Sequence, residues 1–422
     1  MVESFLLAWR ALLRGHVLTA LLALTALAHL LLPAVVRSDG TADGGREVFL
    51  RAVPGSVYTV LCVALLACAC GLVARARESH RLALSVVRPV SAGALMFGPL
   101  LALVAVAAVV LAFNAGLTCA RGGWTDCRHV YAPVLEAPEA AAQRMLKDIL
   151  ANPDTPKEVR SAPRHRLLSI LVGREVDRYE SILPGKSLAW EFPAAAADVP
   201  TGVVARIRFS TQFNMRASLS GQVAFGPWSA SVSNNTQSVL EIPLAAAQGR
   251  RDRPAAEAPK LDFRNTGRST VMLRPRRDVE VLTPADSFGM NLLRATGEML
   301  CVIAFLCAFG LFLSTALSRP VAIFAALVFL VVTEMAPAVL EQYPETLDLP
   351  FTDRMGLWLS RGVAFATSAV SGPQPISDLA TGTCVEWSAL GHAALVDAVV
   401  APCVLLTLAA YLVRRRAAAS RG

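Results

Sequence analysis

The sequence is poor in charged residues and lacks the residue patterns of common enzyme active sites. Only 17% of its 422 residues are charged, whereas 54% are hydrophobic, and the mean hydropathy of +0.49 is high for a soluble globular protein. It contains no nucleophile elbow, no zinc-protease helix and no paired cysteine and histidine spacing. We therefore expect no enzyme activity, no catalytic residue and no metal site in this chain.

Long hydrophobic runs are what the sequence has in abundance. Six stretches are apolar over roughly the 20 residues that a helix needs to cross a bilayer. Because backbone groups in lipid must be hydrogen-bonded within their own segment, each stretch is predicted to be a transmembrane helix. The scarcity of charge inside them disfavours the alternative that one or two are buried helices of a soluble core. The stretches are 17–36, 57–73, 94–113, 299–317, 321–340 and 394–413.

Basic residues gather at one set of ends of these stretches. The positive-inside rule places such segments in the cytoplasm, so we expect both termini inside a bacterial inner membrane. The same segments hold only two acidic residues, Glu3 and Glu78, and their basic excess accounts for the formal net charge of +8 without a nucleic-acid partner. The basic residues are Arg10, Arg14, Arg75, Arg77, Arg81, Arg88, Arg319, Arg414, Arg415, Arg416 and Arg421.

Three of the nine cysteines fall outside the apolar stretches. Cys119 and Cys127 bracket a short polar loop just after the third stretch. An exported compartment is oxidising, which favours a disulfide between them. Cys384 is left without an evident partner. The remaining cysteines lie in the apolar stretches, where thiols behave as small hydrophobic side chains.

The N-terminal segment is predicted to be an amphipathic helix lying in the inner membrane interface, in contact with lipid. The alternative is a simple extension of the first transmembrane helix. The apolar face carries Phe5, Leu6, Trp9, Leu12 and Leu13, and the opposite face carries Arg10 and Arg14.

A large polar insertion separates the first three stretches from the last three. Residues 138–176 show helical spacing, with Pro138 suited to a first helical turn. From residue 188 the period changes to two, and short runs at 190–192, 203–209, 223–225, 239–242, 261–263, 271–273 and 279–281 predict strands of a small antiparallel β-sandwich.

The predicted fold is thus a polytopic α-helical membrane protein with six transmembrane helices, N-in/C-in, and an extracytoplasmic α+β insertion. The predicted domains are 1–114 with the interfacial helix and three spans, 115–185 as an extracytoplasmic helical region, 186–290 as the sandwich, and 291–422 with three spans. The last of these includes an extracytoplasmic segment at 341–393, in which 355–370 is a candidate short interfacial or re-entrant helix.

Two short runs look like nucleotide-binding motifs but lack essential residues. Pro184-Gly185-Lys186-Ser187 resembles the end of a phosphate-binding loop, which needs glycine where Glu180 stands. Residues 219–222 resemble a truncated ABC ATPase signature. Both fall in the predicted extracytoplasmic insertion, where ATP is scarce, so we expect no cofactor in this chain.

Two acidic residues lie inside predicted spans, where charge is costly and often functional. Glu334 is toward the outer end of the fifth stretch, and Asp397 is near the outer start of the sixth. They are candidates for a polar outer vestibule or for pairing with arginine across helices. The alternative is that both reach the nearby interface.

The most informative segment is the charged run at 74–91. It predicts a cytoplasmic helix that projects inward, followed by Pro89, which turns the chain back into the third span. The segment resembles that of the membrane subunits of ABC transporters, in the permease superfamily of type-two exporters. Their second span is followed by a charged segment with a glutamate, an apolar stretch and Pro-Val-Ser, matched here by Glu78, Leu82, Leu84, Pro89, Val90 and Ser91.

The resemblance extends over roughly the membrane half of the chain. It includes the N-terminal helix, the six-span plan, the run 375–382 before the last span and the terminal arginines. Two features depart from the family pattern. Ser79-His80 replaces a common Gly-Thr pair, and Arg88 stands where a small residue is usual.

The resemblance implies a permease subunit that pairs with a separate cytoplasmic ABC ATPase, which holds ATP and Mg²⁺. It also implies a homodimer or paired permease with twelve spans. Closure of the ATPases would act on Arg75, Arg77, Glu78, His80 and Arg81, with the N-terminal helix as the other part of the contact. The alternative function is a non-transporting envelope protein that displays the sandwich on a six-helix anchor. A third hypothesis, an ion-coupled carrier, would need more intramembrane charge than Glu334 and Asp397 supply.

Overall fold

The computed structural model contains two compact units, and the described chain passes between them after Cys127 and after Ala285. We call them the helical unit, which runs to Cys127 and resumes at Asp286, and the sheet unit, Arg128–Ala285. The predicted boundaries are 114 and 290, and the units divide after residues 127 and 285. The structure describes residues 2–36, 42–78, 92–153, 155–156, 159–160, 162–176, 178, 180–196, 202–208, 210–211, 219–226, 228–234, 239–246, 259–340, 355 and 374–419.

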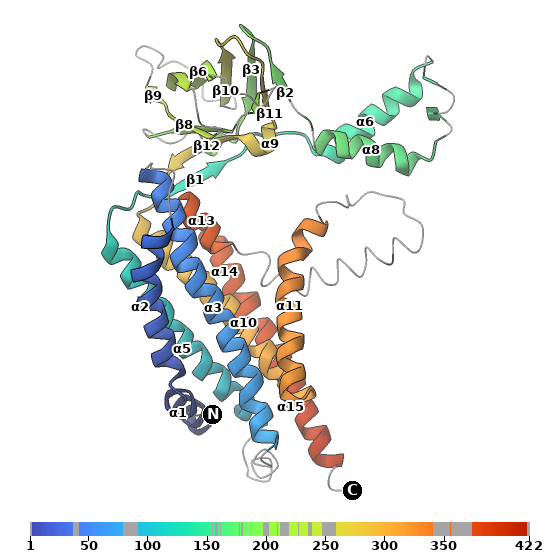
Figure 1. Cartoon of the computed structure of the whole chain (residues 1–422). Coiled ribbons are helices and arrows are strands. Elements are labelled where there is room, and N and C mark those ends of the chain that lie inside the picture. Colours follow the sequence, from blue (N-terminus) through green and yellow to red (C-terminus); the bar gives the residue numbers. More distant parts are fainter. Residues whose placement is uncertain are drawn as a thin grey trace. The chain divides into compact units, whose positions relative to one another are not determined.

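The helical unit is a bundle of long apolar helices (Figure 1). Five helical segments in the described residues are long and apolar enough to cross a membrane: 17–35, 44–74, 95–121, 288–316 and 387–415. Helices of this kind are typical of a membrane protein, and five of the six predicted spans overlap these segments. The helices are α1 (Val2–Arg14), α2 (Val17–Val35), α3 (Ala42–Glu78), α5 (Ala92–Arg121), α10 (Phe288–Ala316), α11 (Arg319–Leu340), α13 (Pro375–Thr381), α14 (Trp387–Leu395) and α15 (Ala401–Ala419), with a π-helical turn, η2 (Val396–Val400), between the last two.

The fifth predicted span, 321–340, coincides with α11, a helix of 22 residues. Its Arg319–Thr333 part is apolar but shorter than a membrane crossing requires. The sixth crossing therefore stays a prediction.

Helix α10 is the centre of the bundle and packs against α3, α5 and α15. A side chain cannot be added to Gly310 on α10 without displacement, because an ideal Cβ there would lie 2.9 Å from the Cβ of Ala69 and 3.1 Å from the backbone oxygen of Leu66 on α3. The glycine thus permits close approach of the two helices, which membrane helices use in place of hydrophobic burial. At its start, the hydroxyl of Ser287 accepts a hydrogen bond from the Met290 N–H and caps the helix.

The sheet unit contains a helix pair and three antiparallel sheets. Helices α6 (Pro138–Ala151) and α8 (Arg164–Val176) pack through a small core around Ala142, Leu171 and Val172, as the helical spacing predicts. The sheets have strand orders β1-β12-β4-β8, β3-β10-β6-β7-β9 and β2-β11-β5.

Alternation of side chains explains why these segments are strands. In β10, Leu261 and Phe263 are fully buried while Asp262 and Arg264 are exposed, the period-two pattern of a half-buried strand. Together with Ile207 and Val281 of the four-stranded sheet they belong to one hydrophobic core. The strands are β1 (Arg128–Tyr131), β2 (Glu180–Ile182), β3 (Ser187–Glu191), β4 (Val204–Arg208), β5 (Ser210–Thr211), β6 (Leu219–Phe225), β7 (Trp228–Asn234), β8 (Val239–Pro243), β9 (Ala245–Ala246), β10 (Lys260–Asn265), β11 (Val271–Leu273) and β12 (Val279–Pro284).

The seven predicted runs correspond to β3, β4, β6, β8, β10, β11 and β12. The predicted helical region 115–185 contains α6 and α8 and also β1 and β2. Strand β1 pairs with β12, with Arg128 opposite Pro284, so the first and last strands of the insertion are neighbours. A four-residue strand gains its stability from that partner, which is far away in the sequence.

Candidate functional site

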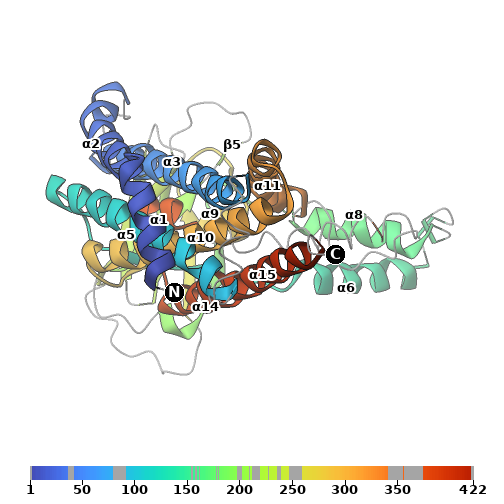
Figure 2. The ribbon, with the colours of Figure 1, turned by 90° about the horizontal axis from the view of Figure 1, so that it is seen from below.

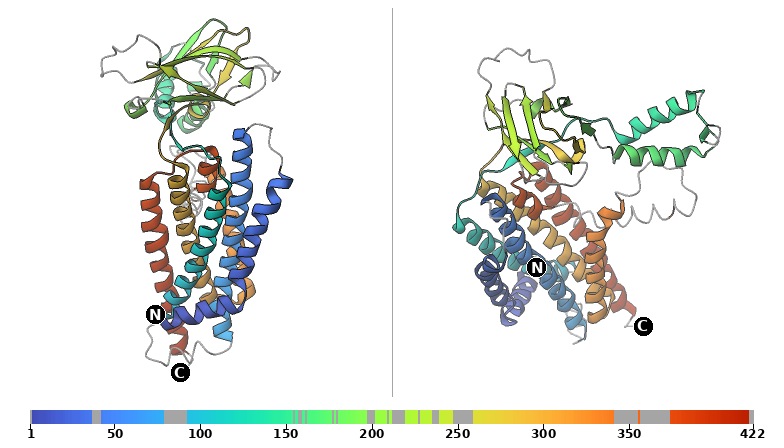
Figure 3. Two further views of the ribbon diagram at one scale, coloured as in Figure 1. Left: turned by 90° about the vertical axis from the view of Figure 1, so that its left-hand side faces the viewer. Right: turned by 45° about the horizontal axis from the view of Figure 1, so that its top comes forward.

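Helix α1 lies across one end of the bundle (Figures 2 and 3). It contacts α5 and α2 and buries Ala8 and Leu12, while Phe5 and Trp9 stack with ring centroids 6.1 Å apart. Arg10 and Arg14 are exposed. A helix packed across the bundle through one face differs from a straight extension of α2, and the left-handed backbone of His16 (φ 54) marks the break between the two helices.

The contact between α1 and α5 depends on a glycine. An ideal Cβ placed on Gly98 of α5 would lie 2.7 Å from the backbone nitrogen of Phe5 and 2.7 Å from the Cβ of Ser4. Real Cβ atoms do not approach backbone so closely, so only glycine permits α1 to lie at this position. Gly98, in the third predicted span, is therefore required for α1 to pack on α5 at this position.

The residues predicted to contact an ATPase are described only in part. The backbone of Arg75, Arg77 and Glu78 forms the last turn of α3, at the end of the bundle where α1 lies (Figure 3). Helix α5 begins at the same end, and α15 ends there, with Arg414 and Arg415 exposed. The predicted contact residues His80, Arg81 and Pro89 lie outside the described residues.

A cavity of about 1160 Å³ opens between α3, α10, α11 and α13. Its wall is mostly apolar, and Arg51 contributes a guanidinium that pairs with Glu47 at 2.9 Å. A cavity of this size, with a few polar groups in an apolar wall, is typical of ligand sites. Its lining includes Arg51, Gly55, Tyr58, Thr59, Cys62, Val302, Leu306, Leu327, Val331, Gln374 and Ser377.

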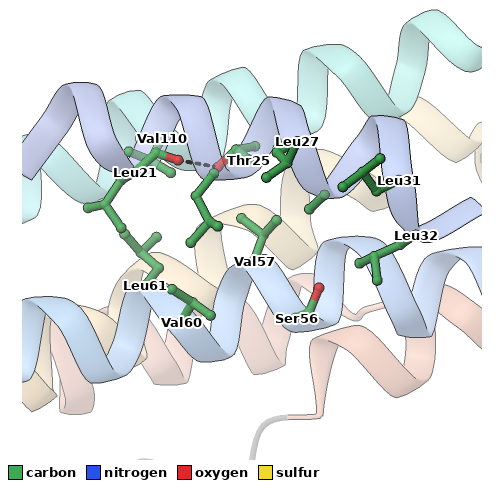
Figure 4. Close-up of a pocket in the computed structure, with 12 residues that line it drawn as sticks. Leu21, Thr25, Leu27, Leu31, Leu32, Ser56, Val57, Val60, Leu61 and Val110 are labelled. Atoms are coloured by element: carbon green, nitrogen blue, oxygen red, sulfur yellow. Dashed lines mark hydrogen bonds between the residues drawn. The ribbon is translucent and has the colours of Figure 1, made fainter.

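A smaller groove of about 290 Å³ lies between α2, α3 and α5 (Figure 4). Leucine and valine side chains line it, and its threonine, Thr25, donates its hydroxyl to the Leu21 carbonyl at 2.8 Å. That internal bond satisfies the hydroxyl within its own helix. The groove is therefore suited to an acyl chain rather than to a polar ligand.

At the opposite end of the bundle from α1, a polar network surrounds the start of α10. Arg294 is only 2% exposed and donates to the Val385 carbonyl at 2.8 Å and to the Asp286 carboxylate. Asn291 accepts from the Val385 N–H at 2.8 Å and donates to the Thr383 carbonyl at 2.8 Å. The network thus ties the segment between α13 and α14 to α10.

Sequence analysis did not identify these residues, because it began the fourth span at residue 299. Helix α10 starts at Phe288, so its first three turns carry polar side chains into the packed bundle. The available signal was their spacing: Asn291, Arg294 and Glu298 recur at three and four residues, which places them on one helical face.

Three acidic side chains also come together near α10. The charges of Asp378 and Asp397 act on Glu298, which is 5% exposed and whose Oε2 has no hydrogen-bond partner among the described residues. Burial raises the pKa of Asp378 above its ordinary value, although the Thr383 hydroxyl opposes the shift. The three acids are not part of any group within the described chain that could hold a metal ion.

Of the two predicted intramembrane acids, Asp397 lies in η2 and is 4% exposed, so its side chain is packed in the bundle. Glu334 lies in α11, and its side chain lies outside the described part of the structure.

The predicted pair of Cys119 and Cys127 differs in burial. Cys119, on the last turns of α5, is exposed, whereas Cys127 is 1% exposed, and both thiols are free. The Cys127 thiol donates to the Asp286 carbonyl at 3.2 Å, and the neighbouring thiol that acts on it is that of Cys384. The disulfide between Cys119 and Cys127 thus stays a prediction that this geometry does not favour.

The sheet unit carries its own charged cluster, on strands β1, β4, β8 and β12. Arg206 donates to Glu241 at 2.8 Å and to Glu280 at 3.2 Å, and Arg128 donates to Glu241 at 2.8 Å. Burial alone would raise the pKa of Glu241, but the hydrogen bonds and charges of Arg206 and Arg128 outweigh it, and the pKa is lowered overall.

This shift makes the stability of the sheet unit depend on pH. Because the folded pKa of Glu241 is below its unfolded value, the ionised carboxylate stabilises the fold above the unfolded value of about 4.5. That contribution is lost as the pH falls through the folded pKa. We expect hydrogen-exchange protection of β4 and β8 to fall on acidification more steeply in the wild type than in Glu241→Gln. Glu191→Gln, which breaks an exposed pair with Lys260, is the matched control and should follow the wild type.

Comparison with known proteins does not identify a family for this chain. No protein-family model, no curated protein and no solved structure matches it. The resemblance to ABC-transporter permeases therefore depends on the sequence patterns described above, and the geometry of the helical unit is the further evidence available for a function.

Proposed function

We propose that this chain is the permease subunit of an ATP-driven ABC transporter in a bacterial inner membrane. It couples a separate cytoplasmic ABC ATPase, which holds ATP and Mg²⁺, to movement of a substrate across the membrane. Six helices cross the bilayer with both termini in the cytoplasm, the sheet unit is extracytoplasmic and binds a substrate or partner, and the permease works as a homodimer or with a paired permease.

The observation that carries this proposal is the position of α1. The helix lies across the end of the bundle where α3 ends and α5 begins, and these two ends flank residues 79–91, which resemble the coupling segment. Gly98 seats α1 directly on α5. A movement applied to α1 and to the end of α3 is thus transmitted into two packed helices rather than into a loose tail.

Charge distribution supports the orientation. Arg10, Arg14, Arg414 and Arg415 are exposed at the end where α1 lies. An aromatic pair lies toward the other end, where the partly buried Trp124 stacks on Phe288 with centroids 4.7 Å apart. Basic residues on the cytoplasmic side and tryptophan at the interface are typical of inner-membrane proteins.

The cavity between α3 and α11 supports transport over a purely anchoring role. A structural anchor gains nothing from a cavity of about 1160 Å³, whereas a transporter needs a place for its substrate between helices that move. Helix α3 provides part of this wall and also ends at the coupling segment, which connects the two regions through a single helix.

The proposal is tested by purifying the full chain in detergent and identifying the chains bound to it. We expect an ABC ATPase to co-purify, and we expect ATP with vanadate to change maleimide labelling of Cys62, which lines the cavity. Charge reversal by Glu78→Lys or Arg81→Glu should abolish that change while ATP hydrolysis and membrane insertion persist. Lys147→Glu, on exposed α6, is the control and should behave as the wild type. Unchanged coupling in both reversals would contradict the coupling assignment.

A second function, an envelope protein displaying the sheet unit, is favoured by one observation. The Cys127 N–H donates to the Asp286 carbonyl at 2.9 Å, so the chain leaves and rejoins the helical unit at adjacent points. This arrangement suits a domain mounted on an anchor. Purification without any bound ATPase, and labelling of Cys62 that does not respond to ATP, would favour this function.

A further inference from the structure

Cys127 and Cys384 are neighbours in the fold, although Cys119 is much nearer to Cys127 in the sequence. Cys127 follows α5, and Cys384 lies between α13 and α14. The two thiols bond to neighbouring carbonyl groups, Cys127 to Asp286 and Cys384 to Val385 at 3.8 Å, and the Cys127 thiol acts on that of Cys384. The surrounding hydrogen bonds fix both chains independently: the Cys127 thiol and N–H both donate to the Asp286 carbonyl, at 3.2 Å and 2.9 Å, and Arg294 joins Asp286 to Val385, the residue after Cys384.

We propose that Cys127 and Cys384 form a disulfide when the protein meets a disulfide oxidant. The extracytoplasmic location of this pair rests on the proposed function, whereas the choice of partners rests on the geometry alone. Cys119 is left as a free, exposed thiol.

The chemistry is a thiol–disulfide exchange with a protein or small-molecule disulfide. Cys384 is the more exposed of the two, so its thiolate attacks the oxidant and forms a mixed disulfide. The thiolate of buried Cys127 then attacks the Cys384 sulfur and releases the second oxidant sulfur. One S–S bond forms in the chain, the oxidant disulfide is reduced to two thiols, and it receives the two electrons and two protons.

Formation of the disulfide removes little hydrogen bonding from the fold. Oxidation removes the Cys127 S–H donor, but the Asp286 carbonyl keeps the Cys127 N–H at 2.9 Å. In return, the bond fixes the segment before α14 to the segment after α5. A disulfide that closes so long a stretch of chain restricts the unfolded chain most strongly.

The surroundings of Cys384 also determine how fast the reaction runs. Burial, with the neighbouring Cys127 thiol, raises the pKa of Cys384 to about 11, although Arg294 opposes the shift. The reactive thiolate is therefore scarce at neutral pH. We expect the rate of oxidation by oxidised glutathione to rise about tenfold per pH unit below that pKa.

The test uses the full chain in two forms, native membranes and purified protein treated with oxidised glutathione. Free thiols are blocked with N-ethylmaleimide, and non-reduced peptides are identified by mass spectrometry. We expect a linked peptide containing Cys127 and Cys384 in both forms, unchanged in Cys119→Ser and lost in Cys384→Ser. Because Cys127→Ser could disturb the buried network, Cys384→Ser, at a partly exposed position, is the deciding variant.

A Cys119–Cys127 link in the wild type would overturn the proposal, and so would two free thiols after glutathione treatment. Linkage in the purified protein with free thiols in native membranes would support the pairing and contradict the extracytoplasmic location. The two inferences are thus tested separately.

Discussion

Arg294→Ala is expected to destabilise the helical unit by about 3 kcal/mol, the sum of a truncated core side chain and lost charge-assisted hydrogen bonds. The guanidinium is 2% exposed, bonds both Val385 and Asp286, and lies over the Trp387 ring at 5.2 Å. Alanine removes all of these contacts and leaves the Val385 carbonyl without its donor. The expected measurement is a lower midpoint of thermal unfolding in detergent.

Two further variants separate the causes. Arg294→Met keeps the aliphatic volume but removes the hydrogen bonds, so it should fall between the wild type and alanine. Arg415→Ala removes an exposed arginine of α15 and should leave the midpoint unchanged. An Arg294→Ala protein as stable as the Arg415→Ala protein would show that the network around α10 contributes little.

Gly98→Leu is expected to displace α1 from α5. Even the first carbon of a new side chain would lie 2.7 Å from the Phe5 nitrogen, and backbone cannot yield as a flexible side chain can. Overpacking of this kind costs about 1–3 kcal/mol. Because α1 is held to the bundle through one face only, we expect the helix to move away rather than keep the strained contact. We expect faster proteolysis within Val2–Arg14 and, under the proposed function, less co-purified ATPase.

The same helix offers a matched control. Gly116 is also on α5, and an added Cβ there meets nothing within 4 Å, so Gly116→Leu should leave proteolysis and co-purification unchanged. If Gly98→Leu and Gly116→Leu behave alike, the contact between α1 and Gly98 does not determine the position of α1. If Gly98→Leu shows normal proteolysis but less co-purified ATPase, the substitution affects the contact with the ATPase and not the position of α1.

Hydrophobic runs and alternation in the sequence predict the helices and strands that carry such a pattern within their own residues. The apolar runs identify five helices that are long enough to span a membrane, and alternation identifies β4 and β10. Hydropathy does not locate polar residues inside a helix, because it treats Arg294 as evidence that the span has not begun. The arginine is stable inside the bundle because Asp286, Val385 and Trp387 are its partners.

Long-range pairing is the part that the sequence could not reveal. Nothing near Arg128 indicates a strand, since β1 is paired with residues 279–284. Likewise, short separation favours pairing Cys127 with Cys119, whereas the fold brings Cys384 to it. For the candidate coupling region, sequence analysis identified α1 and its arginines, but the role of Gly98 depends on a helix contact that no local pattern records.

The adjacency of Cys127 and Asp286 has an evolutionary consequence. Because the two junctions are already hydrogen-bonded to each other, residues 128–285 can be gained, lost or exchanged as a cassette without altering the helices on either side. Under the proposed function, diversification of what the sheet unit binds is then uncoupled from the contact with the ATPase. A lineage carrying this bundle would change its bound target through one recombination event.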